Sequence, residues 1–146
     1  MQLGKASAYA AFATIYVARH QLTGPVSGRR VAEACGIPPE YLLKILQQLA
    51  RAEILRSETG RRGGFTLRKS ADETTLLEIV EAIEGPLDGG LPVRKEVGGT
   101  DAARTQLEAM CSGITRYART LLSKTTIAGL AAKEYQPTST ENPPPV

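Results

Sequence analysis

The stretch PPEYLLKILQQLARAEILRSETGRRGGFTLRK, residues 38–69, contains the pattern that decides the fold. Its first half carries apolar residues at steps of three and four, which predicts a helix with one buried face. These residues are Leu42, Ile45, Leu46 and Leu49. Its second half contains two short alternating runs, ILRSE and FTLRK, which predict two strands. The glycines between the runs allow the positive φ angles of a tight hairpin turn: Gly60, Gly63 and Gly64.

The segments on either side predict further helices. Residues 26–37, VSGRRVAEACGI, predict a short helix that begins with Ser27 as its cap and ends at Gly36. Residues 3–21 predict an earlier helix, and residues 74–86, TTLLEIVEAIEGP, predict a later one with a capping box at its start. The order of helix, helix–turn–helix and hairpin is that of a winged helix-turn-helix, whose second helix enters the major groove of DNA.

Three segments follow the predicted winged domain, which spans residues 1–85. Residues 86–101 have no periodicity and contain four glycines, which predicts a flexible loop and a candidate sensor region. Residues 102–135 predict a long helix followed by a short one. Residues 136–146 are polar and proline-rich, and we expect them to be disordered. The predicted fold class is therefore mainly α with a small β wing.

The long helix carries an apolar stripe with alternating steps of four and three: Leu107, Cys111, Ile114, Ala118 and Leu121. Such a stripe fits a seam between the helices of two chains, and it equally fits packing within one chain. Because two-fold DNA-binding proteins mirror palindromic operators, the pattern favours a dimer interface.

Charge is uneven along the chain, although its formal net charge is only +3. Residues 29–69 contain nine Lys or Arg against four Asp or Glu, whereas residues 72–108 contain three against nine. A basic block followed by an acidic block predicts that one part of the molecule binds a polyanion.

The composition argues against several classes of protein. The single histidine, His20, and two cysteines 76 positions apart provide neither a disulfide framework nor metal-ligand spacing. They also offer no nucleophile–base pair, so we expect no enzyme. The apolar run ASAYAAFATIYVA, residues 6–18, is too short to span a membrane and lacks a signal cleavage site, so we expect a cytoplasmic protein.

Two groups of side chains predict duplex DNA as the partner. The outward face of the helix that starts near Pro39 carries Glu40, Lys44, Gln47 and Arg51. Lysine can pair with guanine edges, glutamine with adenine and glutamate with cytosine, although a merely solvated face would look the same. The hairpin tip adds Arg61 and Arg62, whose guanidinium groups can reach phosphates or the minor groove. This tip, directly after a helix-turn-helix, favours DNA over water as the neighbour.

Residues from about Met1 to Pro86 resemble the Rrf-type bacterial regulators, the group that includes IscR, NsrR and CymR. The matching motifs are EYLLKILQQL, the wing GRRGGFTL and TTLLEIVEAIEGP, with a weaker match in the long helix and TTIAGL. The resemblance implies a homodimer with crossing long helices that binds a palindromic operator, and we expect it to repress transcription. It also implies a contact from Lys5. The residues expected to contact DNA are Lys5, Ser27, Arg29, Glu40, Tyr41, Lys44, Gln47, Arg51, Arg61, Arg62, Gly63 and Gly64.

The chain departs from the family pattern at two places. Several members carry an acidic residue where this chain has Leu43, which cannot accept a hydrogen bond from cytosine, so the family's operator sequence does not carry over. Cluster-binding members supply three cysteines between the wing-proximal helix and the long helix, and residues 86–110 contain none. Because a cluster needs several thiolates, we expect no metal and no cofactor.

Other interpretations stay open at this point. A redox-active Cys111 would make the protein a redox-responsive regulator, although a lone cysteine on an apolar helical face usually packs. A winged helix can also bind protein, so a protein-interaction module is the alternative from another class. The loop over residues 86–101 leaves room for a small-molecule effector, which no residue there identifies.

Overall fold

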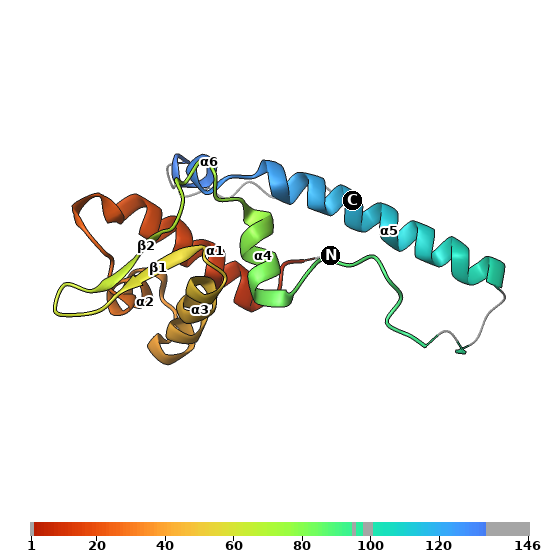
Figure 1. The fold of residues 1–146 in the computed structure, drawn as a ribbon, viewed down its shortest axis with the longest axis horizontal. Helices are drawn as coiled ribbons and strands as arrows, with labels where there is room; N and C mark the ends of the chain where they lie inside the picture. Colours follow the sequence, from red (N-terminus) through yellow and green to blue (C-terminus); the bar gives the residue numbers. More distant parts are fainter. Residues whose placement is uncertain (1, 95, 98–100, 134–146) are drawn as a thin grey trace, which may run out of the picture.

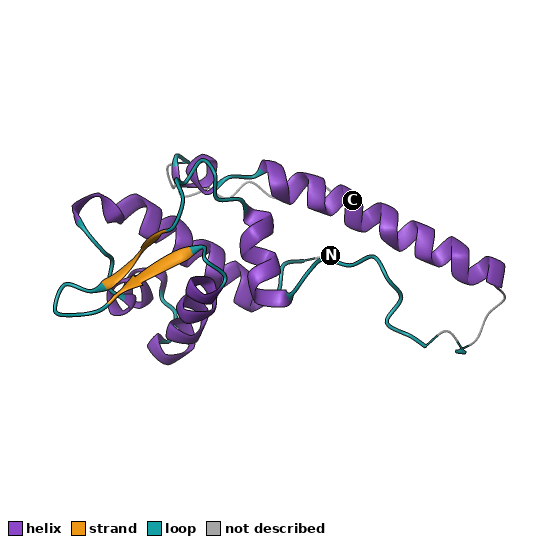
Figure 2. Ribbon diagram, in the orientation of Figure 1, coloured by secondary structure: helices purple, strands orange, loops and turns teal. Residues whose placement is uncertain are grey.

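The computed structural model describes residues 2–94, 96–97 and 101–133, and its elements follow the predicted order (Figure 1). In chain order they are α1 (Lys5–His20), the 3-10 helix η1 (Gln21–Thr23), α2 (Gly28–Cys35), α3 (Pro39–Arg51), β1 (Leu55–Glu58), β2 (Gly64–Leu67), α4 (Leu76–Glu84), α5 (Asp101–Lys124) and α6 (Ile127–Ala131). The predicted fold class is confirmed: helices dominate, and one small hairpin forms the wing (Figure 2). The predicted disordered tail, residues 136–146, lies outside the described residues.

Local chemistry fixes the turn between α2 and α3. Ser27 Oγ accepts a hydrogen bond of 3.3 Å from the Arg30 amide at the start of α2, as predicted for a cap. Gly36 adopts the left-handed conformation at the end of α2, with φ of 64°. Pro39 then begins α3, at a position where its missing N–H removes no intrahelical bond. The helix–turn–helix is therefore specified by residues at the helix ends.

The wing is anchored to the helix–turn–helix by its second strand. β1 and β2 pair antiparallel, with Glu58 opposite Gly64. Val26, which precedes α2, and Phe65 exchange two backbone hydrogen bonds of 2.9 Å each. A Cβ at Gly64 would come within 2.4 Å of the Val26 carbonyl oxygen, so only glycine fits at this crossing.

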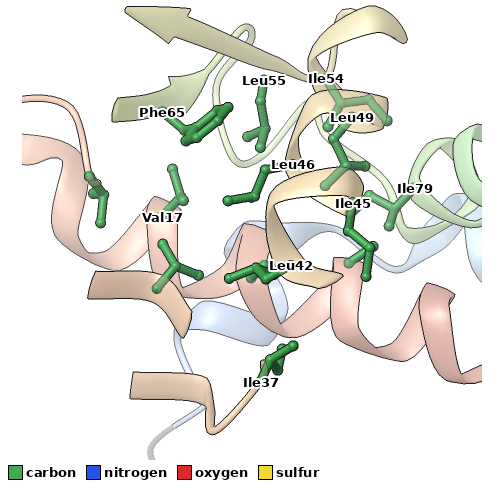
Figure 3. Packing of buried hydrophobic residues seen from close by; sticks show 14 of the residues in the cluster. Val17, Ile37, Leu42, Ile45, Leu46, Leu49, Ile54, Leu55, Phe65 and Ile79 are labelled. Atoms are coloured by element: carbon green, nitrogen blue, oxygen red, sulfur yellow. The ribbon is translucent and has the colours of Figure 1, made fainter. Parts of the chain in front are cut away.

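The hydrophobic core lies on one side of α3 (Figure 3). The predicted stripe is almost fully buried, with exposed fractions between 0% and 3%: Leu42, Ile45, Leu46 and Leu49. Around it pack Val17 of α1, Val31 of α2, Phe65 of β2, Ile79 of α4 and Ile127 of α6. The side of α3 opposite this stripe carries exposed side chains and faces solvent.

The two last helices have different surroundings. α6 folds back onto the domain, where the Ile127 amide donates to the Thr74 carbonyl at 2.8 Å and the Ala128 amide to the Ala71 carbonyl at 2.9 Å. The C-terminal part of α5 packs on α4. The N-terminal part of α5 extends away from the winged domain (Figure 1). None of the helices in the described ranges combines the length and the hydrophobicity needed to cross a membrane.

Candidate nucleic-acid interface

α3 presents the predicted polar face on the side opposite the core. Its members are all exposed: Glu40, Lys44, Gln47 and Arg51. Neither Lys44 nor Arg51 has a hydrogen bond or ion pair within the described part of the chain. A helix whose outer side chains are uncommitted is what the major groove requires, because base edges supply the missing partners.

Two exposed residues outside the predicted contact set lie on α3 and on the wing. Leu43 lies one turn before Gln47 on α3 and is 46% exposed. An exposed leucine gains no favourable contact from water, whereas the methyl group of a thymine in the major groove can pack against it. Arg56 is an exposed cation on β1, next to the buried Leu55.

The wing turn directs two guanidinium groups outward. The Gly63 amide donates to the Gly60 carbonyl at 3.0 Å, which closes a turn with Arg61 and Arg62 at its two central positions. Both arginines are exposed and lack a partner among the described residues. A Cβ at Gly63 would come within 2.3 Å of a wing carbonyl oxygen. Gly63 and Gly64 therefore shape the wing, and the arginines supply its free charge.

The base of the hairpin is charge-paired, in contrast to its tip. Arg68 lies 3.7 Å from Glu53, and Lys69 Nζ lies 2.5 Å from Glu78 Oε1. Glu78 also completes the capping box with Thr75 at the start of α4. Burial by itself raises the pKa of Glu78, but hydrogen bonds from Lys69 and Thr75 outweigh it, so this pKa lies below its ordinary value of 4.5. The cations at the base serve the fold, whereas those at the tip remain available to an external anion.

The other predicted contacts lie at the starts of helices. Lys5 begins α1 and sits 5.6 Å over the ring of Tyr9, which meets the Tyr41 ring edge-on with centroids 5.8 Å apart. The start of α1 therefore lies beside the start of α3. Ser27 uses its hydroxyl as the cap of α2, and Arg29 forms an exposed ion pair of 3.0 Å one turn further along that helix. Exposed ion pairs contribute little to stability, so Arg29 can exchange Glu33 for a phosphate.

α5 carries a stripe of large apolar side chains that the described chain leaves between 47% and 68% exposed. They are Leu107, Met110, Ile114, Tyr117 and Leu121. Leu107, Ile114 and Leu121 belong to the predicted seam. The other two predicted members, Cys111 and Ala118, are not part of the exposed stripe. Ala118 faces α4 and is only 8% exposed, and Cys111 is half-buried. Because each residue turns the helix by about 100°, Met110 and Tyr117 complete the outward stripe in their place.

The fold, the uncommitted face of α3 and the basic wing tip define a winged helix-turn-helix protein of the DNA-binding class. The sequence matches a family model, Rrf2, described as "Iron-dependent Transcriptional regulator", over residues 3–133. The chain belongs to the Rrf2 family of transcriptional regulators and is not an enzyme, which confirms the resemblance seen in its motifs.

Individual relatives agree with this assignment, and a solved structure shares the fold. The protein Rv1287 of Mycobacterium tuberculosis, named as an HTH-type transcriptional regulator, is 30% identical over 135 residues, covering 90% of this chain and 81% of that protein. IscR of Photorhabdus laumondii is 32% identical over 88 residues, covering 60% of this chain and 54% of IscR. The structure of CymR, the global cysteine regulator of B. subtilis, shares the fold with a TM-score of 0.73 at 23% identity, covering 90% of this chain and 97% of that one.

The family description mentions iron, which thiolate, imidazole or carboxylate side chains of the protein would have to bind. The two cysteines, Cys35 of α2 and Cys111 of α5, are both free. Burial raises the pKa of Cys35, which disfavours the thiolate form that binds iron. The described residues contain no group of three or more His, Cys, Asp or Glu side chains positioned to hold a metal ion. These residues do not fit an iron–sulfur cluster held by this chain.

Proposed function

We propose that two copies of this chain bind a palindromic operator in duplex DNA and repress transcription of the adjacent gene in the cytoplasm. The observation that carries the proposal is the combination of an uncommitted polar face on α3 with two free arginines at the wing tip. Base edges can satisfy the first and phosphates the second, so one docked duplex satisfies both.

A second copy is the partner that suits the α5 stripe. Five large side chains about half exposed along one helix are unfavourable in water, and their steps of three and four match a helix–helix seam. An apolar groove of ≈ 350 Å³ adjoins the stripe, between the start of the chain, α4 and α5, and shares Ile114 and Leu121 with it. In a two-fold dimer each stripe meets its own copy, which buries both.

The two DNA-facing elements have separate roles in this proposal. Lys44, Gln47 and the neighbouring Leu43 project from a rigid helix, so they read base edges and a thymine methyl group. Arg61 and Arg62 lie on a glycine turn and contact phosphates or the minor groove, where little sequence information is available. Repression follows where the operator overlaps a promoter, because the bound dimer then occupies the surface that the polymerase needs.

Selection of bound duplexes from a random library, followed by sequencing, tests the proposal. We expect a consensus with two inverted half-sites. The logarithm of the association constant should fall linearly with the logarithm of the salt concentration, with a slope of about −0.9 for each phosphate contacted. A scrambled duplex of the same length is the control for non-specific binding. A promoter carrying the consensus should be silenced by the protein in a reporter strain. Equal affinity for consensus and scrambled duplexes would instead support the protein-interaction module.

A further inference from the structure

The last turn of α4 is the meeting point of four parts of the molecule. This turn comprises residues 81–84, and its side chains or carbonyls bind the recognition helix α3, the long helix α5, the loop that follows α4 and the start of α1. The attachments to α3, α5 and α1 are hydrogen bonds or ion pairs between segments that are far apart in the sequence.

The attachment to α3, the helix proposed to enter the major groove, uses a glutamine beside its exposed polar face. Gln48 Nε2 donates to the carbonyls of Ala82 at 3.2 Å and Ile83 at 3.3 Å. The last four carbonyls of a helix lack partners within it, so the Gln48 amide supplies an external cap for α4. Gln48 and the candidate reading residue Gln47 are adjacent on α3, yet only Gln48 is committed to the fold.

The attachments to α5 and α1 use the two glutamates of the same turn. Glu81 forms an ion pair with Arg119 of α5 and accepts a hydrogen bond of 3.0 Å from the Leu87 amide. Glu84 accepts hydrogen bonds from the Gly4 amide at 3.1 Å and from the fully buried Ser7 hydroxyl at 2.6 Å. α4 also packs directly against both α3 and α5, whereas these two helices make no comparable contact with each other in the described ranges.

The geometry points to the last turn of α4 as the device that sets the spacing of the two half-sites, with Gln48 and the Glu81–Arg119 pair as positioning residues. This inference rests on the proposed function, since only a dimer on a palindrome has a half-site spacing. In such a dimer α5 joins the two protomers and α3 reads each half-site, so the angle between α3 and α5 fixes the distance between the recognition helices. One added base pair displaces a half-site by about 3.4 Å and rotates it by about 35°. A rigid junction cannot follow that change.

The experiment compares two neighbouring glutamines in the full-length protein. Affinities are measured for the selected operator and for versions with one base pair inserted or deleted between the half-sites. The unmodified protein should prefer the selected spacing by about tenfold or more. Gln48→Leu should reduce that preference by about threefold, because it removes the external cap while keeping the side chain's size. Gln47→Leu, the matched control, should weaken binding at every spacing and leave the preference unchanged.

A second variant covers the case in which Gln48→Leu does not fold. Arg119→Gln breaks the ion pair with Glu81 on the other side of the junction and should relax the spacing preference in the same way. A folded variant of either kind that keeps the full preference, or that loses affinity equally at every spacing, overturns the inference. An unmodified protein that binds a single half-site as tightly as the palindrome would instead overturn the proposed function, so the two failures are distinguishable.

Discussion

The winged domain and α5 use apolar side chains in opposite ways. The stripe of α3 is at most 3% exposed and is surrounded by five other elements, whereas the stripe of α5 is about half exposed along its length. Both stripes have helical spacing, and both belong to helices with polar residues on the other face. The winged domain therefore contains the surfaces that bury its own stripe. Within the described residues, no surface covers the stripe of α5.

The contrast is tested most strongly within α3. Leu46 is fully buried and Leu43 is 46% exposed on the opposite face of the same helix. Replacing Leu46 by Ala should lower the free energy of unfolding by about 2–5 kcal/mol, through lost burial and a residual cavity. Leu43→Ala should change it by less than about 0.5 kcal/mol. Urea denaturation followed by circular dichroism measures both, and a similar loss for the two variants would contradict the assignment of the faces.

The proposed dimer interface is the next test, since it concerns the exposed stripe directly. Replacing Ile114 and Leu121 together by Glu should give a folded monomer, because two buried charges on each side of the seam cannot be paired. Light scattering should then report the chain mass of 15.6 kDa in place of twice that value. Affinity for the palindrome should fall by about 100-fold or more as one half-site's contacts are lost.

The matched control for the dimer test lies on the same helix. Thr120 is exposed, and among the described residues its hydroxyl donates to the Arg116 carbonyl of its own helix alone. Thr120→Glu should therefore keep the dimer. An unmodified protein that is monomeric at all concentrations would show that the stripe of α5 has another purpose.

The same contrast explains which features could be predicted from the sequence. Local signals are self-contained: Ser27, Gly36 and Pro39 specify a turn whatever surrounds them, and each lies where its chemistry placed it. The stripe of α3 was also predictable, because its apolar face is continuous. On α5 the periodicity located the apolar stripe, but it did not show which of its residues are exposed and which pack within the chain. Ala118 is small enough to pack against α4, and a spacing rule does not reveal which neighbour a residue meets.

The candidate interface was predictable in part for the same reason. Arg61 and Arg62 stand out because two adjacent cations in a glycine turn have no local explanation. The role of Gln48 could not be inferred, since its partners are two backbone carbonyls 34 and 35 positions away. Neighbouring Gln47 has the same side chain and a different environment. Long-range hydrogen bonds of this kind leave no periodic trace in the sequence.

Within the winged domain, a smaller effect should separate base reading from phosphate contact. Gln47→Ala should cost about 1–3 kcal/mol on the selected operator and little on a scrambled duplex. Replacing Arg61 and Arg62 together by Ala should weaken binding to both duplexes and lower the salt slope by about one to two units. Titrations at several salt concentrations measure both. Equal losses on the two duplexes for Gln47→Ala would mean that another surface faces the DNA.

A still smaller effect is expected at the start of α4, the helix between the two regions. Glu78→Gln should lower stability at neutral pH by about 0.5–1 kcal/mol, because it weakens the capping box and the pair with Lys69. The pKa of Glu78 is lowered in the fold, so its contribution is present above the unfolded value near 4.5 and is lost as the pH falls through the folded value. The stability difference between the two proteins should therefore shrink in acid. A difference independent of pH down to full protonation would contradict this role.

Treatment with an iron chelator should have the smallest effect of all, and this prediction concerns the segment that joins the two regions. α5 holds this segment directly: Arg104 donates to the Arg94 carbonyl at 2.8 Å and to the Val97 carbonyl at 3.1 Å. Hydrogen bonds thus tie Arg94 and Val97 to α5, in a segment in which the sequence places no cysteine. Protein purified without oxygen should lack stoichiometric iron and acid-labile sulfide, and treatment with a chelator should leave operator affinity unchanged. A visible charge-transfer band that disappears together with operator binding would show that other donors recruit the metal and that operator binding depends on it.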